Sequence, residues 1–103
     1  MSVSQRGLLR FEGFDWDAGN AEKCQKHGLS IAEVESVFSD RVLILNDTTN
    51  SETEQRFRAI GNAASGRKAF IVFTMRGSFI RPLSARYMHR KEINRYEKDN
   101  PDF

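Results

Sequence analysis

The strongest constraint on the fold is a nearly unbroken apolar run, Ala69-Phe70-Ile71-Val72-Phe73. Its β-branched and aromatic residues favour a strand, and no polar residue interrupts it to create an exposed face. The run therefore predicts a central strand that is covered on both faces. A chain of 103 residues is long enough for one modest core, so we expect a single domain over residues 1–103.

Three further segments have strand character. Val42–Leu45 is apolar and β-branched, and Arg56–Ile60 alternates in part between apolar and polar residues. Phe79–Ala85 follows a turn signal at Arg76-Gly77. Short turns between consecutive strands imply antiparallel neighbours, so we predict an antiparallel sheet of about four strands in a meander. The polar run Asp47–Glu54 is expected to be an exposed loop.

Two short helices are predicted before these strands. Asp17 is placed to cap a helix over Ala18–Lys26, and Gly28 suits the left-handed residue that closes it. Ser30-Ile31-Ala32-Glu33 is a capping box, which predicts a second helix over Ile31–Ser39. We expect the two helices to pack as one unit across one face of the sheet.

A basic helix is predicted at the C-terminal end, over Met88–Lys98, with few apolar anchors. Asn100-Pro101 is expected to end it. The fold class is therefore α+β, with two N-terminal helices, the antiparallel sheet and a C-terminal basic helix. Before the helices, residues 1–10 are expected to fray or form an edge strand, and Phe11–Trp16 to supply aromatic core residues.

The net charge of +2 conceals a strong asymmetry along the chain. Residues 1–55 contain five basic and ten acidic side chains, whereas residues 56–98 contain eleven basic and two acidic ones. A cationic half of this kind attracts polyanions, of which nucleic acid is the commonest in a cytoplasm. The alternative is a solvated basic surface with no specific ligand.

Several classes of site have little support. The single cysteine, Cys24, excludes an internal disulfide, and two histidines far apart in sequence do not suggest a zinc site. Asp47, Glu52 and Glu54 form the densest acidic cluster, but they lack the spacing of a known cation-binding motif. We therefore expect no metal and no cofactor. Neither a signal peptide nor a membrane-spanning run is evident, so we expect a cytoplasmic protein without a membrane partner.

Polar chemistry is concentrated in Ser78–Glu92. Regular strand alternation would place Arg81 and Arg86 on opposite faces, but Pro82 requires either an edge strand or a local bulge. A bulge would let both guanidinium groups face one way and grip a phosphate. The alternative is that one of the two arginines forms a structural ion pair with an N-terminal carboxylate.

His27 and His89 are the side chains best suited to proton transfer near neutral pH. His27 follows the first predicted helix, so it could instead cap the carbonyl groups there. His89 could equally decorate the surface of the basic helix. No serine or cysteine lies in a recognised nucleophile motif, so a hydrolase triad is not suggested.

Four motifs between Phe11 and Glu97 occur in a characteristic order. They are Phe14-Asp15-Trp16-Asp17 with Asn20 and Lys26-His27-Gly28-Leu29-Ser30; Val37-Phe38-Ser39-Asp40; Glu54-Gln55-Arg56-Phe57-Arg58-Ala59-Ile60-Gly61; and Thr74-Met75-Arg76-Gly77 through Ile80-Arg81-Pro82-Leu83-Ser84-Ala85-Arg86 to Glu92, with Tyr96-Glu97. Together they resemble the BrnT toxins of bacterial toxin–antitoxin systems. The resemblance implies a RelE-like fold and a metal-independent ribonuclease that arrests translation. It also implies a ribbon-helix-helix antitoxin as partner, with promoter DNA bound only through the antitoxin complex.

The resemblance and the chemistry together select the candidate site residues. The candidate catalytic residues are His27, Arg81, Ser84 and Arg86, and the candidate RNA-binding residues are Arg56, Arg76, His89, Arg90 and Lys91. Arg81 and Arg86 would stabilise the charged phosphate, and His27 would transfer a proton. Asn50 occupies a loop position where family members often have a histidine. The alternative function is a non-catalytic module that binds nucleic acid or protein through the basic half.

Overall fold

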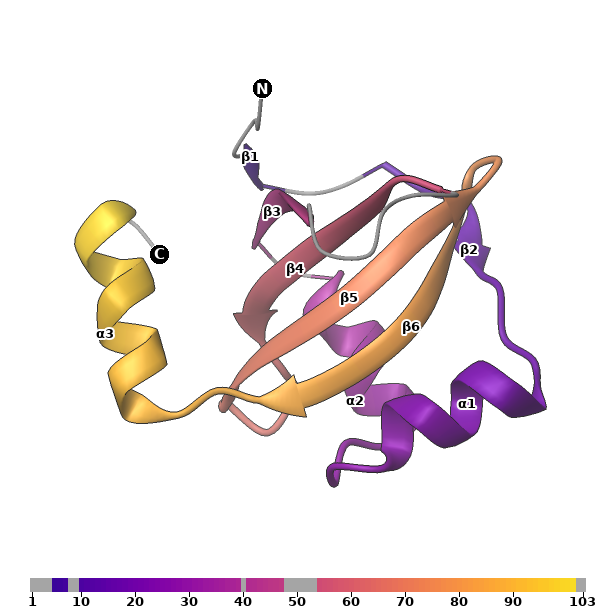
Figure 1. Ribbon diagram of the computed structural model, residues 1–103, viewed down its shortest axis with the longest axis horizontal. Helices are drawn as coiled ribbons and strands as arrows, with labels where there is room; N and C mark the ends of the chain where they lie inside the picture. The colour runs from indigo at the N-terminus through magenta and orange to yellow at the C-terminus, as the bar shows by residue number, and fades with distance from the viewer. Residues whose placement is uncertain (1–4, 8–9, 40, 48–53, 102–103) are drawn as a thin grey trace.

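The computed structural model describes residues 5–7, 10–39, 41–47 and 54–101. Within them lie three helices and a six-stranded sheet of order β1-β3-β4-β5-β6-β2 (Figure 1). The elements are β1 (Gln5–Gly7), β2 (Gly13–Phe14), α1 (Ala18–Gln25), α2 (Ile31–Val37), β3 (Val42–Asp47), β4 (Arg56–Asn62), β5 (Lys68–Arg76), β6 (Phe79–Tyr87) and α3 (Arg90–Asp99). The general α+β class is therefore confirmed.

The four predicted strands form the central meander from β3 to β6, with antiparallel pairing throughout. The predicted strand number was wrong, because two short strands extend the sheet at its edges. β1 pairs antiparallel with β3, and β2 pairs parallel with β6, so the sheet is mixed. Segments of three and two residues are too short to show strand periodicity in a sequence. The RelE-like arrangement remains a prediction.

Helices α1 and α2 pack on one face of this sheet, as expected, and both begin at the predicted caps (Figure 1). The Asp17 carboxylate accepts a hydrogen bond from the Asn20 N–H at 3.0 Å, and Ser30 and Glu33 form the capping box of α2. The core beneath them includes Cys24, Val34, Val37, Phe38, Ile71, Phe73, Ile80 and Ala85, with Phe11, Phe14 and Trp16 packed at its margin.

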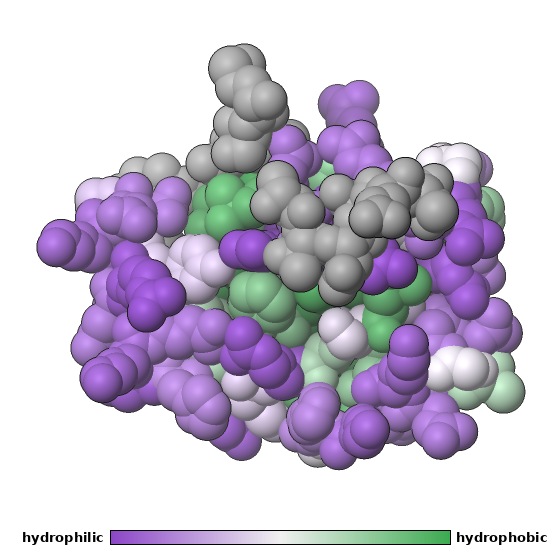
Figure 2. Space-filling model, viewed as in Figure 1, coloured by the Kyte–Doolittle hydropathy of each residue, from purple (hydrophilic) through white to green (hydrophobic). Residues whose placement is uncertain are grey.

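The opposite face carries a smaller core under α3. Leu43, Ile60 and Met88 are buried there, and Phe70, Ile93 and Tyr96 pack against them, among other residues. No residue of α3 itself is fully buried. Figure 1 shows α3 beside the sheet and away from α1 and α2. In Figure 2, apolar side chains lie at the centre of the same view and hydrophilic side chains surround them. The helix is thus held by a few partly buried anchors.

The start of α3 lies two residues later than predicted. The Met88 N–H donates to the Lys68 carbonyl at 2.9 Å, so Met88 continues the pairing with β5 instead of entering the helix. His89 is the N-cap in an extended conformation, and Arg90 is the first helical residue. Asn100 ends the helix, as expected. His89 therefore lies at the junction between sheet and helix.

A β-bulge in β6 determines which side chains face α3. Val72 pairs with Ser84 and Phe73 with Pro82, which leaves Leu83 as an extra residue on β6. Because the alternation restarts there, Pro82 and Ala85 are both buried on the side of α1 and α2. Of the two alternatives that Pro82 allowed, an edge strand or a local bulge, the strand register shows the bulge.

Arg81 and Arg86 consequently lie on one face of the sheet. Arg81 is opposite Thr74 and Arg86 is opposite Phe70, and both partners face away from the α1–α2 core. The guanidinium group of Arg86 lies 4.4 Å above the Phe70 ring centre, which agrees with that orientation. The placement of both arginines on one face is therefore confirmed, and their side-chain directions are described below.

Candidate functional site

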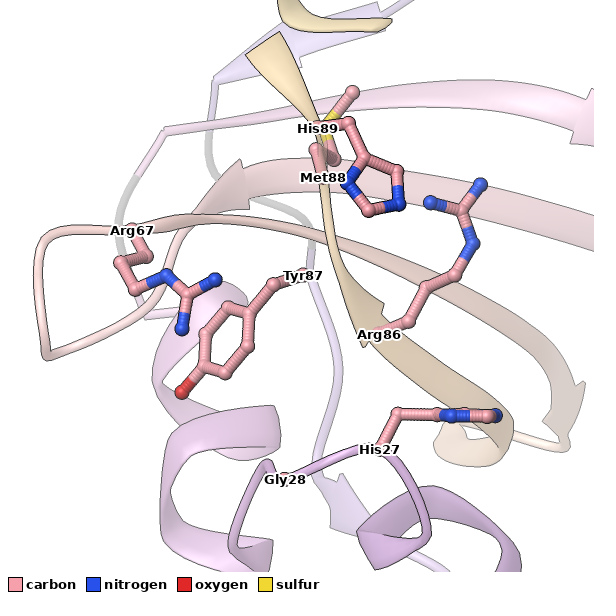
Figure 3. A pocket seen from close by; sticks show the side chains of 7 residues that line it. All are labelled: His27, Gly28, Arg67, Arg86, Tyr87, Met88 and His89. Carbon is pink, nitrogen blue, oxygen red and sulfur yellow. The ribbon is translucent and has the colours of Figure 1, made fainter.

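A hollow of ≈ 520 Å³ opens where β6 ends and α3 begins. Three segments distant in sequence meet there: the turn after α1, the β4–β5 turn, and the continuous stretch from the end of β6 to the cap of α3. Its walls are formed by His27, Gly28, Arg67, Arg86, Tyr87, Met88 and His89 (Figure 3). Both histidines of the chain thus meet two arginines and a tyrosine in one hollow.

His27 reaches the hollow because α1 ends just before it. The helix stops at Gln25, and Gly28 adopts a φ of 101° that reverses the chain toward α2. A side chain at position 28 would be strained in this conformation. The glycine therefore determines where the His27 imidazole is presented.

Arg86 is held rigidly on the opposite wall. Its two terminal nitrogens each donate to one oxygen of the Glu92 carboxylate at 2.7 Å, and its guanidinium lies over Phe70. These hydrogen bonds raise the pKa of Arg86 and lower the pKa of Glu92. The Arg86 side chain nevertheless keeps 39% of its surface exposed. The site therefore contains a permanent, oriented and accessible positive charge.

Tyr87 and Arg67 form the third wall. The Tyr87 hydroxyl donates to the Glu33 carboxylate at 2.6 Å, which raises the pKa of Tyr87 and lowers the pKa of Glu33. The Arg67 guanidinium stacks over the Tyr87 ring at 3.7 Å from its centre (Figure 3). The Tyr87 hydroxyl proton is engaged in the hydrogen bond to Glu33, so the contribution of Tyr87 to the hollow is its ring. The ring packs against the Arg67 guanidinium and holds this positive charge at the rim of the hollow.

The two imidazole rings carry no structural hydrogen bond within the described ranges. His89 caps α3 through its backbone only, and Figure 3 shows its ring beside the Arg86 guanidinium. His27 extends from the other side of the hollow, and no hydrogen bond joins its side chain to the carbonyl groups of α1 in the described ranges. The alternative in which His27 caps that helix thus has no supporting hydrogen bond among the residues that the structure describes.

Arg81 occupies different surroundings from Arg86. Its guanidinium donates to Asp17 at 2.7 Å and lies 3.6 Å from Asp15, which is the N-terminal ion pair considered as an alternative. The Asp17 contact raises the pKa of Arg81. The pKa of Asp17 is lowered, first by the Asn20 N–H and then by Arg81. The cross-strand partners of Arg81 and Arg86 are four positions apart on β5, or roughly 13 Å.

A comparison with protein families identifies the relationship. The model of the family described as ribonuclease toxin, BrnT, of type II toxin-antitoxin systems matches residues 16–92, well over half of the chain. The chain belongs to this family. Neither the curated proteins nor the solved structures contain a match. Membership of a type II toxin-antitoxin family implies a cognate antitoxin as partner. Every residue that lines the hollow lies within the matched range of residues 16–92.

In this BrnT chain the predicted site residues form two groups, and Ser84 belongs to neither. His27, Arg86 and His89 line the hollow, and Arg90 and Lys91 follow in the first turn of α3. Ser84 is exposed on β6 opposite Val72 and does not line the hollow. The residues toward the other end of the sheet are Arg56, Arg76 and Arg81. Arg76 lies 3.7 Å from Glu54, and the partly buried Arg56 has an Nε atom without a hydrogen-bond partner among the described residues.

Sequence reasoning missed Arg67 and Tyr87 as site residues. Arg67 belongs to the basic turn Gly66-Arg67-Lys68, whose charge was the only available signal. Tyr87 lies inside the segment that concentrates the polar chemistry, but strand alternation alone did not indicate a stacked arginine. Asn50 lies outside the described residues, so its proposed correspondence to a family histidine has no structural counterpart here.

The described part of this BrnT chain offers little support for metal or thiolate chemistry. No group of three or more histidine, cysteine, aspartate or glutamate residues there is arranged to hold a metal ion. Cys24 is fully buried, and this desolvation raises the pKa of its thiol to about 11. A thiolate nucleophile at neutral pH is therefore disfavoured. In the same ranges, none of the helices has the length and apolar character needed to traverse a bilayer.

Proposed function

We propose that this chain is a metal-independent endoribonuclease toxin that cleaves RNA in the hollow at the end of β6 and thereby arrests translation. One observation carries the proposal: His27, from the turn after α1, lines the same hollow as Arg86 and His89, from the junction of β6 and α3. Membership of a ribonuclease toxin family supplies the reaction class. The residues supply the two functions that RNA cleavage needs, proton transfer and charge stabilisation.

The proposed reaction uses the ribose 2′-hydroxyl of the substrate as nucleophile. Its oxygen bonds to the adjacent phosphorus while the bond from phosphorus to the 5′-oxygen breaks, leaving a 2′,3′-cyclic phosphate and a 5′-hydroxyl. One proton leaves the 2′-hydroxyl and one is delivered to the 5′-oxygen. The two imidazoles of His27 and His89 supply these transfers, since histidine changes protonation state near neutral pH.

Arg86 stabilises the negative charge that accumulates on the phosphate. Its guanidinium is oriented before substrate arrives, because Glu92 and Phe70 hold it from two sides. Such preorganised charge stabilises a transition state without reorganisation during the reaction. Arg67, at the rim, adds a second cation for the RNA backbone. Arg81, by contrast, contributes to the stability of the fold through its ion pair with Asp17. Ser84 lies on the exposed surface of the sheet.

We further propose that the antitoxin is a ribbon-helix-helix protein that binds promoter DNA and carries the toxin with it. The family implies an antitoxin, and the eleven basic side chains of residues 56–98 favour an acidic toxin-binding segment. The toxin itself would contact promoter DNA only through this complex.

The decisive experiment is incubation of the purified protein with RNA in excess EDTA. We expect cleavage that leaves cyclic phosphate and 5′-hydroxyl ends, and we expect the combined His27→Ala and Arg86→Ala variant to lose it. The second candidate function, a non-catalytic binding module, rests on the same basic half. Intact RNA together with an undiminished gel shift would establish that alternative instead.

A further inference from the structure

A second hollow, of ≈ 430 Å³, adjoins the first on the side of α3. Its lining residues are Asn62, Gly66, Arg67, Lys68, Met88, Arg90, Ile93 and Glu97. Arg67 and Met88 belong to both hollows, so the two share a wall. Neither histidine lines the second one, which separates it from the proposed chemistry.

The lining of this second hollow has two kinds of surface. Three cations line it: Arg67 from the β4–β5 turn, Lys68 from the start of β5, and Arg90 from the first turn of α3. Met88 and Ile93 contribute an apolar wall, and both belong to the small core under α3. Asn62 and Glu97 add an amide and a carboxylate. Cations beside an apolar surface are what a nucleotide needs, because its phosphate is charged and its base is flat and largely apolar on its faces.

We propose that the second hollow is a nucleotide subsite that binds the RNA residue next to the cleaved phosphodiester. The inference rests on the proposed ribonuclease function. It adds recognition of a neighbouring RNA nucleotide to cleavage of the phosphodiester bond. Arg90 and Lys68 hold the adjacent phosphate, while the base packs against Met88 and Ile93. Arg67, which lines both hollows, contacts the backbone between the two nucleotides.

The continuity of the hollows favours a single-stranded nucleic acid over a small anion. An isolated phosphate would use the cations of one hollow only, whereas a strand engages both at once and gains from each contact. The junction of Met88 with Lys68 supports this arrangement, because that 2.9 Å hydrogen bond anchors the chain between the two hollows just before α3 begins. The start of α3 thus forms one wall of the RNA path.

The test is binding of a 2′-O-methyl hexanucleotide, which cannot be cleaved, to the full chain at several salt concentrations. We expect the double variant Lys68→Gln with Arg90→Gln to bind about tenfold more weakly or worse, and to reduce the salt slope by about 0.7 for each lost phosphate contact. Lys23→Gln, an exposed charge change on α1, is the matched control. Thermal unfolding must show that all variants remain folded.

Cleavage of RNA provides the second arm. On unmodified RNA, the double variant should lose several-fold more kcat/KM on a hexanucleotide than on a dinucleotide, since the dinucleotide lacks the adjacent phosphate that Lys68 and Arg90 hold. Wild-type affinity and slope in the double variant, or a loss no larger than that of Lys23→Gln, would overturn the subsite. An equal loss of binding to an acidic peptide would overturn its preference for nucleotides. Absence of cleavage by the wild type overturns the ribonuclease proposal, while the binding arm still decides the subsite.

Discussion

The two ends of β6 present the same chemistry in different surroundings. Arg81 and Arg86 lie on one face, and each donates to a carboxylate at 2.7 Å. The partners of Arg81 precede and cap α1, so this pair ties the start of β6 to the N-terminal helix. The partner of Arg86 belongs to α3, and the same hollow contains both histidines. The two pairs therefore differ in their neighbours, since only the Arg86 pair adjoins side chains suited to proton transfer.

The difference is visible in how accessible the two arginines are. The Arg81 side chain keeps 17% of its surface exposed, and Arg86 keeps 39%. Asn20 strengthens the first end, because its side-chain amide donates to the carbonyl groups of Asp15 and Pro82, both at 2.9 Å. The Arg81 end of β6 is therefore a packed contact with the N-terminal segment, whereas the Arg86 end lines a solvent-accessible hollow. The predictions below test that distinction.

Arg86→Ala should have the largest effect on activity. We expect kcat/KM for RNA cleavage to fall by about 10²–10³-fold, because the variant loses a preorganised charge at the developing phosphate anion. Arg86→Lys should restore only part of it, since an ammonium group cannot reproduce the two-point contact with Glu92. Equal losses in Arg86→Ala and Arg81→Ala would remove the contrast between the two ends of β6.

His27→Ala and His89→Ala should each reduce kcat by about 10²-fold or more, since each removes one proton transfer. Thermal unfolding should change little, because neither imidazole makes a hydrogen bond with the residues that the structure describes. The measurement is RNA cleavage at saturating substrate, beside a melting curve for each variant. Loss of folding without a specific loss of cleavage would show that the histidine is structural.

Glu92→Gln should reduce kcat/KM by about tenfold, because the neutral amide no longer holds the Arg86 guanidinium by two charge-assisted hydrogen bonds. KM should rise less than kcat falls, since the charge of Arg86 remains in the hollow. The check is a full kinetic profile with Glu22→Gln on α1 as the charge-matched control. An increase in activity would mean that Glu92 masks Arg86 and that RNA must displace it.

Arg81→Ala should leave the hollow intact and act on the scaffold. We expect the melting temperature to fall by a few degrees at most, as for a partly exposed ion pair, while kcat changes by less than about threefold. A melting curve and a cleavage assay on the same preparation measure both. A large loss of kcat at temperatures where the variant is fully folded would instead place Arg81 in the catalytic machinery.

Acid pH should weaken both ends of β6 together. Because the pKa values of Asp17 and Glu92 are lowered by folding, the unfolded chain takes up more protons as the pH falls. This stability is complete above the ordinary values of 3.8 and 4.5 and is lost as the pH falls through the lower folded values. Urea unfolding at pH 7 and at about pH 3.5 should show the loss. Glu92→Gln should reduce this pH dependence, and an unchanged dependence would contradict the contribution assigned to the Arg86–Glu92 pair.

Local signals in the sequence were enough for much of the fold. Asp17 and the Ser30–Glu33 box predicted both helix starts, because a cap depends only on residues within one turn. Pro82 predicted an edge strand or a bulge, because a residue without an N–H cannot donate to a strand ladder, and the structure has the bulge. The edge strands β1 and β2 were underestimated or missed, since their pairing partners lie far away in the chain.

The candidate site was predictable only in part. His27, Arg86 and His89 were identified as suitable residue types, but their approach depends on the Gly28 turn, the β6 bulge and the cap of α3 acting together. Tertiary structure alone decided that Arg67 stacks on Tyr87 and that Arg81 turns away toward Asp17. The physical reason is range: capping and strand alternation operate over a few residues, whereas the choice of ion-pair and stacking partners depends on which distant segments the packed sheet brings together.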